Sequence, residues 1–227
     1  MVRGLLNPSP WGDLPEDAPF VLPMDRTAVK DWNLNASPSS KIRTDLIPDP
    51  PLGDPLIAAV VVLALNPSLS DEDVDQHRDP GFREQVRSAM TEPDGLFWLR
   101  DDVWTTTGGR WWRSKLGPLI DAASLETVRR HVAVGHLHQY HSKSSSPLLK
   151  PPSGRHNLEL IRKAIPRGIP ILALTGVARW RAADPAIRPA HLWEPQSAQA
   201  MVVSPRNLPG GFEAAVRALA SVDADQT

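Results

Sequence analysis

The chain has 227 residues, with 25 Lys and Arg against 26 Asp and Glu, and it contains no cysteine. This length is typical of one domain, and the missing cysteine excludes disulfide scaffolds, Cys-ligated zinc, iron–sulfur clusters and a Cys nucleophile. The sequence has no apolar stretch of about 18 residues or more and no signal-peptide pattern at its start. We therefore expect a cytoplasmic protein without a membrane partner.

Charge is distributed unevenly along the chain. Residues 1–100 hold 9 basic and 16 acidic residues, whereas residues 101–227 hold 16 and 10. The block 110–181 carries 13 basic residues against three acidic ones, together with five of the seven histidines. Such clustering favours a phosphate-rich partner, while a solvated surface in an Arg-rich chain is an equal alternative. DNA or another nucleic acid is the predicted partner, and a nucleotide is the second.

The first 55 residues contain ten prolines and one short apolar run, 20–22. Because each proline removes a backbone donor and disfavours helix at the preceding residue, this segment is predicted to be an extended arm. Spaced apolar anchors such as Trp11, Phe20 and Trp32 need a surface to pack on. We expect residues 1–55 to lie on a domain spanning residues 56–221, followed by a frayed tail at 222–227.

Residues 56–65 form a continuous apolar run rich in Val, which is typical of a central strand covered on both faces. Residues 132–134, 169–174 and 200–203 are three further candidate strands. Helical patterns cover about 79–90, 109–122, 156–165 and 212–219. This alternation predicts an α/β fold, a three-layer α/β/α sandwich with a mostly parallel central sheet of about four strands.

Ligands of such sheets bind beyond the carboxyl ends of the strands, so the residues that follow each strand are candidates. Asn66 follows the first strand, where its amide can bind a base edge or a water, or can merely cap the turn. After the second strand, Tyr140, His141, Ser142 and Lys143 offer a stacking ring, an imidazole, a hydroxyl and a cation. That set suits a base with its phosphate, and a polar loop around one buried Tyr is the alternative.

Three other groups follow strands or flank a helix. His136 and His138 face the same way on a strand, but the sequence places no third ligand, so we predict neither a metal nor a cofactor. The turn before Arg179 can receive an anion on its amides. Trp111 and Trp112 can stack on bases or pack internally, and Trp112 shares the apolar stripe of its predicted helix.

Residues 61–68, with their Leu-Asn-Pro sequence, resemble the first motif of the uracil-DNA glycosylase superfamily, and most of all its mismatch-specific branch. Residues 202–207, which include Ser-Pro-Arg-Asn, stand where that superfamily has its second motif. These two motifs occur in one order with the Pro-rich run 48–55, Trp111-Trp112 and Tyr140-His141-Ser142. This order is similar to that of uncharacterised bacterial proteins related to the same fold, and the likeness covers most of residues 10–220. Ala64 stands where that branch has Gly, and the second motif lacks its His.

The resemblance implies a DNA glycosylase-like hydrolase of DNA repair or modified-base recognition, which holds a flipped, modified or mismatched base and cleaves its N-glycosidic bond. In this relationship Asn66 orients a water for attack at the sugar C1′, and Ser204 or Asn207 stabilises the departing base. His141 would be the electrophile or orienter. The remaining expected contacts are Pro67, Ser68, Tyr140, Ser142 and Arg206 to the base, and Arg110, Arg113, Lys143 and Arg179 to phosphates.

Two alternatives use the same pocket. One is a non-catalytic module that binds a nucleic acid or a nucleotide, because an amide such as that of Asn66 is a poor base. The other is a hydrolase of a free nucleoside or nucleotide, which a closed pocket without a basic groove would favour over a DNA enzyme.

Overall fold

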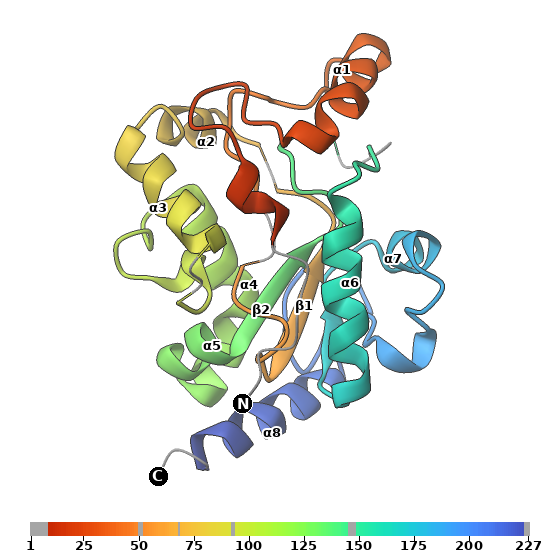
Figure 1. The fold of residues 1–227 in the computed structure, drawn as a ribbon. Coiled ribbons are helices and arrows are strands. Elements are labelled where there is room, and N and C mark those ends of the chain that lie inside the picture. Colours follow the sequence, from red (N-terminus) through yellow and green to blue (C-terminus); the bar gives the residue numbers. More distant parts are fainter. Residues whose placement is uncertain (1–8, 50–51, 68, 92–93, 145–148, 225–227) are drawn as a thin grey trace.

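A parallel sheet of three strands lies at the centre of the molecule (Figure 1). The computed structural model describes residues 9–49, 52–67, 69–91, 94–144 and 149–224. Within these residues the strands are β1 (Val60–Ala64), β2 (Val132–His136) and β3 (Ile171–Ala173), in the order β2-β1-β3. The register runs from Val60 opposite Val132 to Ala64 opposite His136, and Val61 lies opposite Ile171.

Eight α-helices surround the sheet in the described part of the chain. They are α1 (Arg26–Asn35), α2 (Asp71–Gln76), α3 (Pro80–Thr91), α4 (Thr107–Ala123), α5 (Leu125–His131), α6 (Gly154–Ala164), α7 (Val177–Ala183) and α8 (Gly211–Ala224). The four helices that the sequence predicts correspond to α3, α4, α6 and α8. No helix among the described residues combines the length and the apolar character that crossing a membrane requires.

The central strand is buried on both faces, as its unbroken apolar run predicts. Val60, Val62 and Ala64 belong to one core cluster with side chains of α4, α5 and α8. Val61 and Leu63 belong to a second cluster with side chains of α6 and α7. Successive strand residues point to opposite faces, so each face of the sheet is covered by its own set of helices (Figure 1). The prediction of a mixed α/β fold with a parallel sheet is confirmed.

The prediction of a fourth strand at residues 200–203 is wrong. Met201 has a φ of +39°, which is incompatible with an extended strand. The backbone N–H of Val203 donates to the carbonyl of Lys115 in α4 and not to a sheet neighbour. The place beside β3 is taken instead by Trp193, which forms a single parallel bridge with Leu172. An apolar stretch this short cannot be told from buried coil by its pattern alone.

The described part of the Pro-rich arm supplies core side chains and a helix. Trp11, Phe20, Leu22 and Leu52 belong to the same core cluster as Val60. The arm is predicted to be extended, yet residues 26–35 form α1, since the stretch between Pro23 and Pro38 is free of proline and so keeps every backbone donor. Figure 1 shows α1 and α2 at the end of the molecule opposite α8.

A buried hydrogen-bond network fixes the arm to the domain. The Tyr140 hydroxyl donates to Asp25 Oδ2 over 2.7 Å and accepts from the backbone N–H of Leu22 over 3.2 Å. The other oxygen of Asp25 accepts from the backbone N–H of Ser153 over 2.9 Å. Asp25 and Tyr140 are both fully buried, so water cannot replace a lost partner.

This network generates a prediction for stability. Tyr140→Phe removes the hydroxyl and so takes away the hydrogen-bond partner of Asp25 Oδ2 and of the Leu22 N–H in the core, while Asp25 Oδ1 keeps its bond to Ser153. We therefore expect the free energy of unfolding to fall by about 1–3 kcal/mol. Urea denaturation followed by Trp fluorescence measures it. Thr91→Val, which removes an exposed hydroxyl from α3, is the control and should change stability by less than about 0.5 kcal/mol. Equal effects of the two substitutions would contradict the assignment.

Candidate functional site

A small cavity lies where β1 and β2 end, at the carboxyl edge of the sheet. Its volume is about 60 Å³, which is small compared with drug-binding pockets and suits a single planar ring or a few waters. Its walls come from the arm, the residues after β1, α2, the start of α4 and the end of β2. The lining residues are Asp49, Asn66, Pro67, Asp73, Gln76, His77, Trp98, Gly108, Trp111, Trp112, His136 and His141.

Asn66 is held in one orientation at the end of the central strand. Its Nδ2 donates to the backbone oxygen of Pro67 over 3.0 Å and to that of Ser142 over 3.3 Å. Both partners are carbonyls, which only accept, so they determine which end of the amide carries the nitrogen. The described residues donate no hydrogen bond to Asn66 Oδ1. This oxygen is therefore the atom of Asn66 that can accept from a ligand or a water.

Asp49 brings a buried carboxyl group into the cavity from the arm. Its backbone N–H donates to the carbonyl of Gln139 over 2.8 Å, which fastens this part of the arm beside β2. Its Oδ2 lies 3.5 Å from His136 Nδ1, and its Oδ1 has no hydrogen-bond partner among the described residues. Burial raises the pKa of Asp49 to about 8; the nearby Trp98 indole N–H opposes this rise, and the charge of Asp73 adds to it.

The second carboxyl group of the cavity, that of Asp73, is fixed by the start of α2. Ser70 and Asp73 form a capping box, in which Asp73 Oδ2 accepts from the backbone N–H and from the hydroxyl of Ser70, each over 2.7 Å. The cavity thus holds two acidic side chains in different surroundings. Pairs of this kind recur where one group donates a proton and the other accepts one.

Two of the histidines that line the cavity are buried as neutral rings. Burial lowers the pKa of His136 to about 3 and that of His77 to about 3 as well. His77 Nδ1 accepts from the backbone N–H of Ile47, and its ring meets that of His141 edge to face at 5.1 Å. His136 Nδ1 lies 3.3 Å from the backbone oxygen of Asp49, an acceptor, so the hydrogen bond requires the Nδ1–H tautomer.

Tryptophan rings form the apolar walls of the cavity. Trp111 and Trp112 meet edge to face at 4.7 Å; Trp112 is buried, as predicted, while Trp111 is half-buried at the mouth. Gly108 lets Trp98 approach α4, because a Cβ at this position would lie 2.5 Å from the Trp98 ring. A planar ligand would find aromatic faces here and polar groups at its edge.

The structure brings only some of the predicted site residues to this cavity. Asn66, Pro67 and His141 line it, and Ser142 contacts Asn66. Tyr140 is fully buried beneath the arm, so its ring is not open to a base. Ser68 lies outside the described residues.

The second predicted motif does not reach the cavity. Ser204 Oγ accepts from the backbone N–H of Asn207, and Asn207 is bound to Val202 and Ser197. Ser204, Arg206 and Asn207 are absent from the cavity walls. Asn207 stabilises its own turn, which replaces the strand that the sequence predicts at this place.

The four predicted phosphate contacts are dispersed. Arg110 Nη2 donates to both carboxylate oxygens of Glu72, over 2.8 and 2.7 Å, and the Arg113 guanidinium lies 3.7 Å from the centre of the Trp104 ring. Lys143 is exposed just after Ser142. Arg179 lines a separate cavity of about 440 Å³ beside α6 and α7. Among the described residues, none that lines the smaller cavity is a Lys or an Arg.

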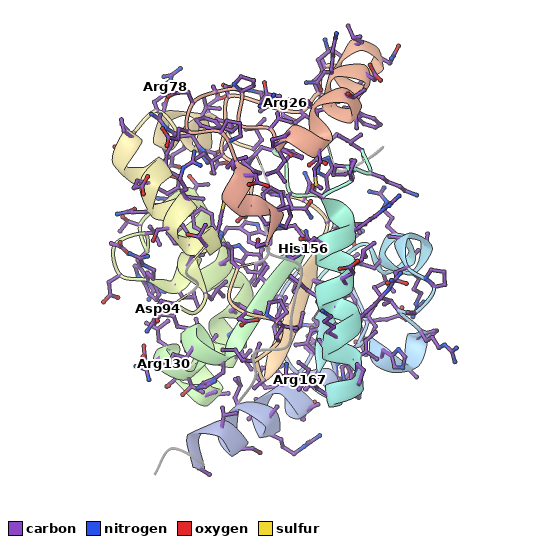
Figure 2. The ribbon with its side chains drawn as sticks, viewed as in Figure 1. Arg26, Arg78, Asp94, Arg130, His156 and Arg167 are labelled. Carbon is purple, nitrogen blue, oxygen red and sulfur yellow. The ribbon has the colours of Figure 1, made fainter. Side chains whose placement is uncertain are left out.

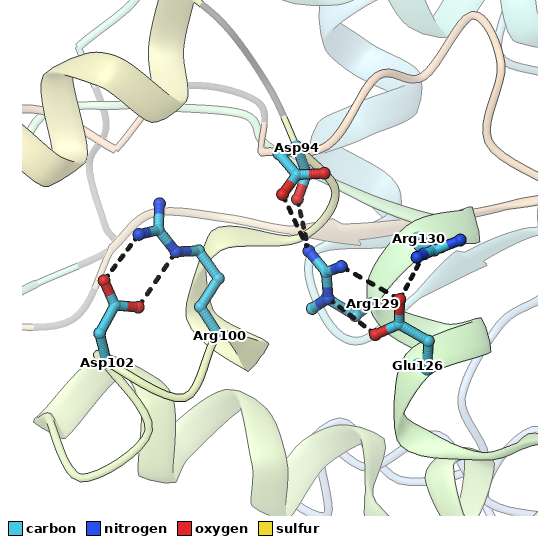
Figure 3. A network of polar contacts seen from close by, with 6 residues as sticks. All are labelled: Asp94, Arg100, Asp102, Glu126, Arg129 and Arg130. Atoms are coloured by element: carbon cyan, nitrogen blue, oxygen red, sulfur yellow. Dashed lines mark hydrogen bonds and ion pairs between the residues drawn. The ribbon is translucent and has the colours of Figure 1, made fainter.

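Five of the 13 basic residues in block 110–181 form ion pairs in the described structure: Arg110, Arg129, Arg130, Arg162 and Arg181. Arg129 and Arg130 both pair with Glu126, and Arg129 also reaches Asp94, while Arg100 binds Asp102 close by (Figure 3). On α6 and α7, Arg162 pairs with Asp184 and Arg181 with Glu194. Figure 2 shows Arg130 on α5 and Arg167 just after α6, on the two sides of the sheet. The described cations therefore form no single basic stripe around the cavity.

Sequence reasoning did not propose Asp49, Asp73, His77 or Trp98 as site residues. Asp49 stands between two prolines, Pro48 and Pro50, a spacing that hints at a fixed backbone. The cap signal of Asp73 is visible in the sequence as a Ser three residues before an acid, but it points only to a helix start. His77 and Trp98 carry no pattern that marks them.

Comparisons with models of protein families, with curated proteins and with solved structures each found no match. We therefore infer the function of this protein from its own residues and their geometry.

The buried histidines predict a loss of stability in acid. Between about pH 3 and 6.5 the unfolded chain binds a proton at His77 that the folded protein does not. The contribution of neutral His77 to the free energy of unfolding is therefore fully present above pH 6.5 and is lost as the pH falls toward 3. We expect His77→Gln to make the slope of unfolding free energy against pH shallower by up to about 1.4 kcal/mol per pH unit.

Urea denaturation at pH 4–7 measures this slope. Ile161→Val, a core change on the opposite face of the sheet, is the control, because it lowers stability without altering proton binding. A slope that is the same in His77→Gln and wild type would show that His77 is not buried as a neutral ring.

Proposed function

We propose that this protein hydrolyses the N-glycosidic bond of a modified, mismatched or deaminated base in DNA. The observation that carries the proposal is the placement of Asn66. Its Oδ1 is available at the end of the central strand, beside a small aromatic cavity that also holds two carboxyl groups. This arrangement supports the relationship to the uracil-DNA glycosylase superfamily, in which the corresponding side chain orients the attacking water.

The residues can divide the chemistry between them. Asn66 Oδ1 accepts a hydrogen bond from the water and aims its oxygen at the sugar C1′, while the base lies between the Trp side chains. The C1′–N bond breaks with its electron pair leaving on the base, the C1′–O bond to water forms, and the proton that the water loses passes to a carboxyl group of the cavity or to the departing base. An oxocarbenium-like transition state needs little help from a base, so an amide that only positions the water suffices. Asp49, Asp73 and His141 line the cavity, and side chains of these types can donate or accept protons.

A free nucleoside or nucleotide is the second candidate substrate. One observation favours it, namely that no Lys or Arg of the described part of the chain lines the cavity and that Arg110, next to Trp111 in the sequence, is already bound to Glu72. DNA binding ordinarily draws on several unpaired cations near the site. The two candidates share the same chemistry at C1′ and differ in what holds the rest of the substrate.

The test compares two single substitutions on a panel of substrates. We expect Asn66→Ala to lower the rate of base release by at least about 100-fold, because the water loses its orientation, while binding of the base persists. Ser204→Ala is the matched control and should keep near wild-type activity, since Ser204 bonds only within its own turn. Abasic-site formation on duplexes that contain uracil, hypoxanthine or a G·T mismatch, and base release from free nucleosides, are measured side by side.

Each outcome selects one function. Base release from duplexes alone supports the DNA enzyme, and release from nucleosides alone supports the second candidate. If wild type and Asn66→Ala both bind a duplex but release no base from any substrate, both hydrolase functions are contradicted and a non-catalytic binding module remains. Loss of activity in Ser204→Ala equal to that in Asn66→Ala would place the reaction elsewhere.

A further inference from the structure

Asp49 combines three properties that a purely structural carboxyl group does not need. The residue is 4 % exposed, yet it lines the same cavity as Asn66. Its Oδ1 has no hydrogen-bond partner among the described residues, and the Trp98 indole N–H beside it also lacks a partner of good geometry. Buried polar groups are rarely left unpaired, because each one costs free energy. A bound molecule that pairs with them would remove this cost.

We propose that Asp49 acts as a neutral carboxylic acid that donates a hydrogen bond to an acceptor on the edge of the bound base and so determines which bases enter the cavity. This inference rests on the proposed function and adds a specificity residue that the resemblance does not assign. An acid in this form offers a donor on one carboxyl oxygen and an acceptor on the other. A carbonyl oxygen or an unprotonated ring nitrogen of the base would accept the hydrogen bond from the O–H of Asp49.

The surroundings of Asp49 keep it neutral at physiological pH. Burial is the largest cause of its raised pKa of about 8, and the negative charge of Asp73 from α2 adds to it. His136 of β2 and His77 beyond α2 are neutral, so neither supplies a positive charge. His141 is the remaining titratable group among the described lining residues, and these include no Lys or Arg. An ionised Asp49 would have no cation in these walls to stabilise it.

The neutral form matters for the departing base as well. A base that leaves C1′ with the bonding electron pair accumulates negative charge on its ring, and a donor aimed at a ring carbonyl or nitrogen stabilises that charge. An ionised carboxylate in the same place would repel it. Acids held neutral by an apolar site serve as donors of this kind in other enzymes. The donor role therefore predicts that base binding weakens when Asp49 loses its proton.

Base binding at several pH values tests this role. Duplexes containing uracil, hypoxanthine or a G·T mismatch are titrated against the protein between pH 6 and 9.5 at fixed ionic strength, with Trp fluorescence as the readout and an unmodified duplex as the reference. We expect the preference of wild type for at least one of these duplexes to fall about tenfold per pH unit above about 8.

Three variants separate the donor role from other roles. Asp49→Asn keeps a donor and an acceptor but cannot ionise, so it should keep the affinity at pH 7 within about threefold and lose the fall above pH 8. Asp49→Ala should lose at least about tenfold at pH 7. Asp31→Asn, the same change on the exposed surface of α1, is the control and should follow wild type at every pH.

The possible failures are distinguishable. A preference that does not change above pH 8, or an Asp49→Asn variant that behaves like Asp49→Ala, overturns the donor role while the proposed function stands. A wild type with no preference for any of the three duplexes at any pH overturns the proposed function, and this inference with it. Urea denaturation of each Asp49 variant shows that the altered binding does not come from unfolding.

Discussion

The strand β1 has no side that faces water, and its burial dictates where the other elements lie. Val60 and Val62 require cover on one face, which α4, α5 and α8 supply, while Val61 and Leu63 require cover on the other, which α6 and α7 supply. A parallel strand cannot be joined to its neighbour by a tight turn, so the chain must leave the sheet after each strand and return through a helix. The carboxyl ends of β1 and β2 consequently meet at one edge, and the cavity forms there.

The arm closes this edge. Leu52 forms an antiparallel bridge with Val134 of β2, and Asp49 bonds to Gln139, so both residues lie beside β2, with Asp49 at the cavity. A buried hydrogen bond between Tyr140 and Asp25 fixes an earlier part of the arm. The site is therefore built from parts far apart in the sequence. Its polar groups are buried by the arm, and this burial shifts the pKa of Asp49 up and that of His136 down.

The many basic residues of block 110–181 do not give the cavity a basic lining. The block 110–181 has 13 basic residues, and a count along the chain places them near the predicted pocket. In the fold, Glu72 from α2 neutralises Arg110, Glu126 binds Arg129 and Arg130, and other members point to separate surfaces. A linear count cannot show this, because the acids that pair with these cations come from other segments. The cavity that results is aromatic and acidic, without a basic wall.

The sequence by itself determined the α/β class, the buried central strand and the place of Asn66, because an unbroken apolar run and an Asn-Pro stop are local signals. The apolar stripe of α4 likewise identified Trp112 as a core residue. Only the tertiary structure decided that Asp49 joins Asn66, that Tyr140 is hidden and that Ser204 stays outside. These outcomes depend on which segments meet in space, and long-range packing leaves no periodic trace in the chain.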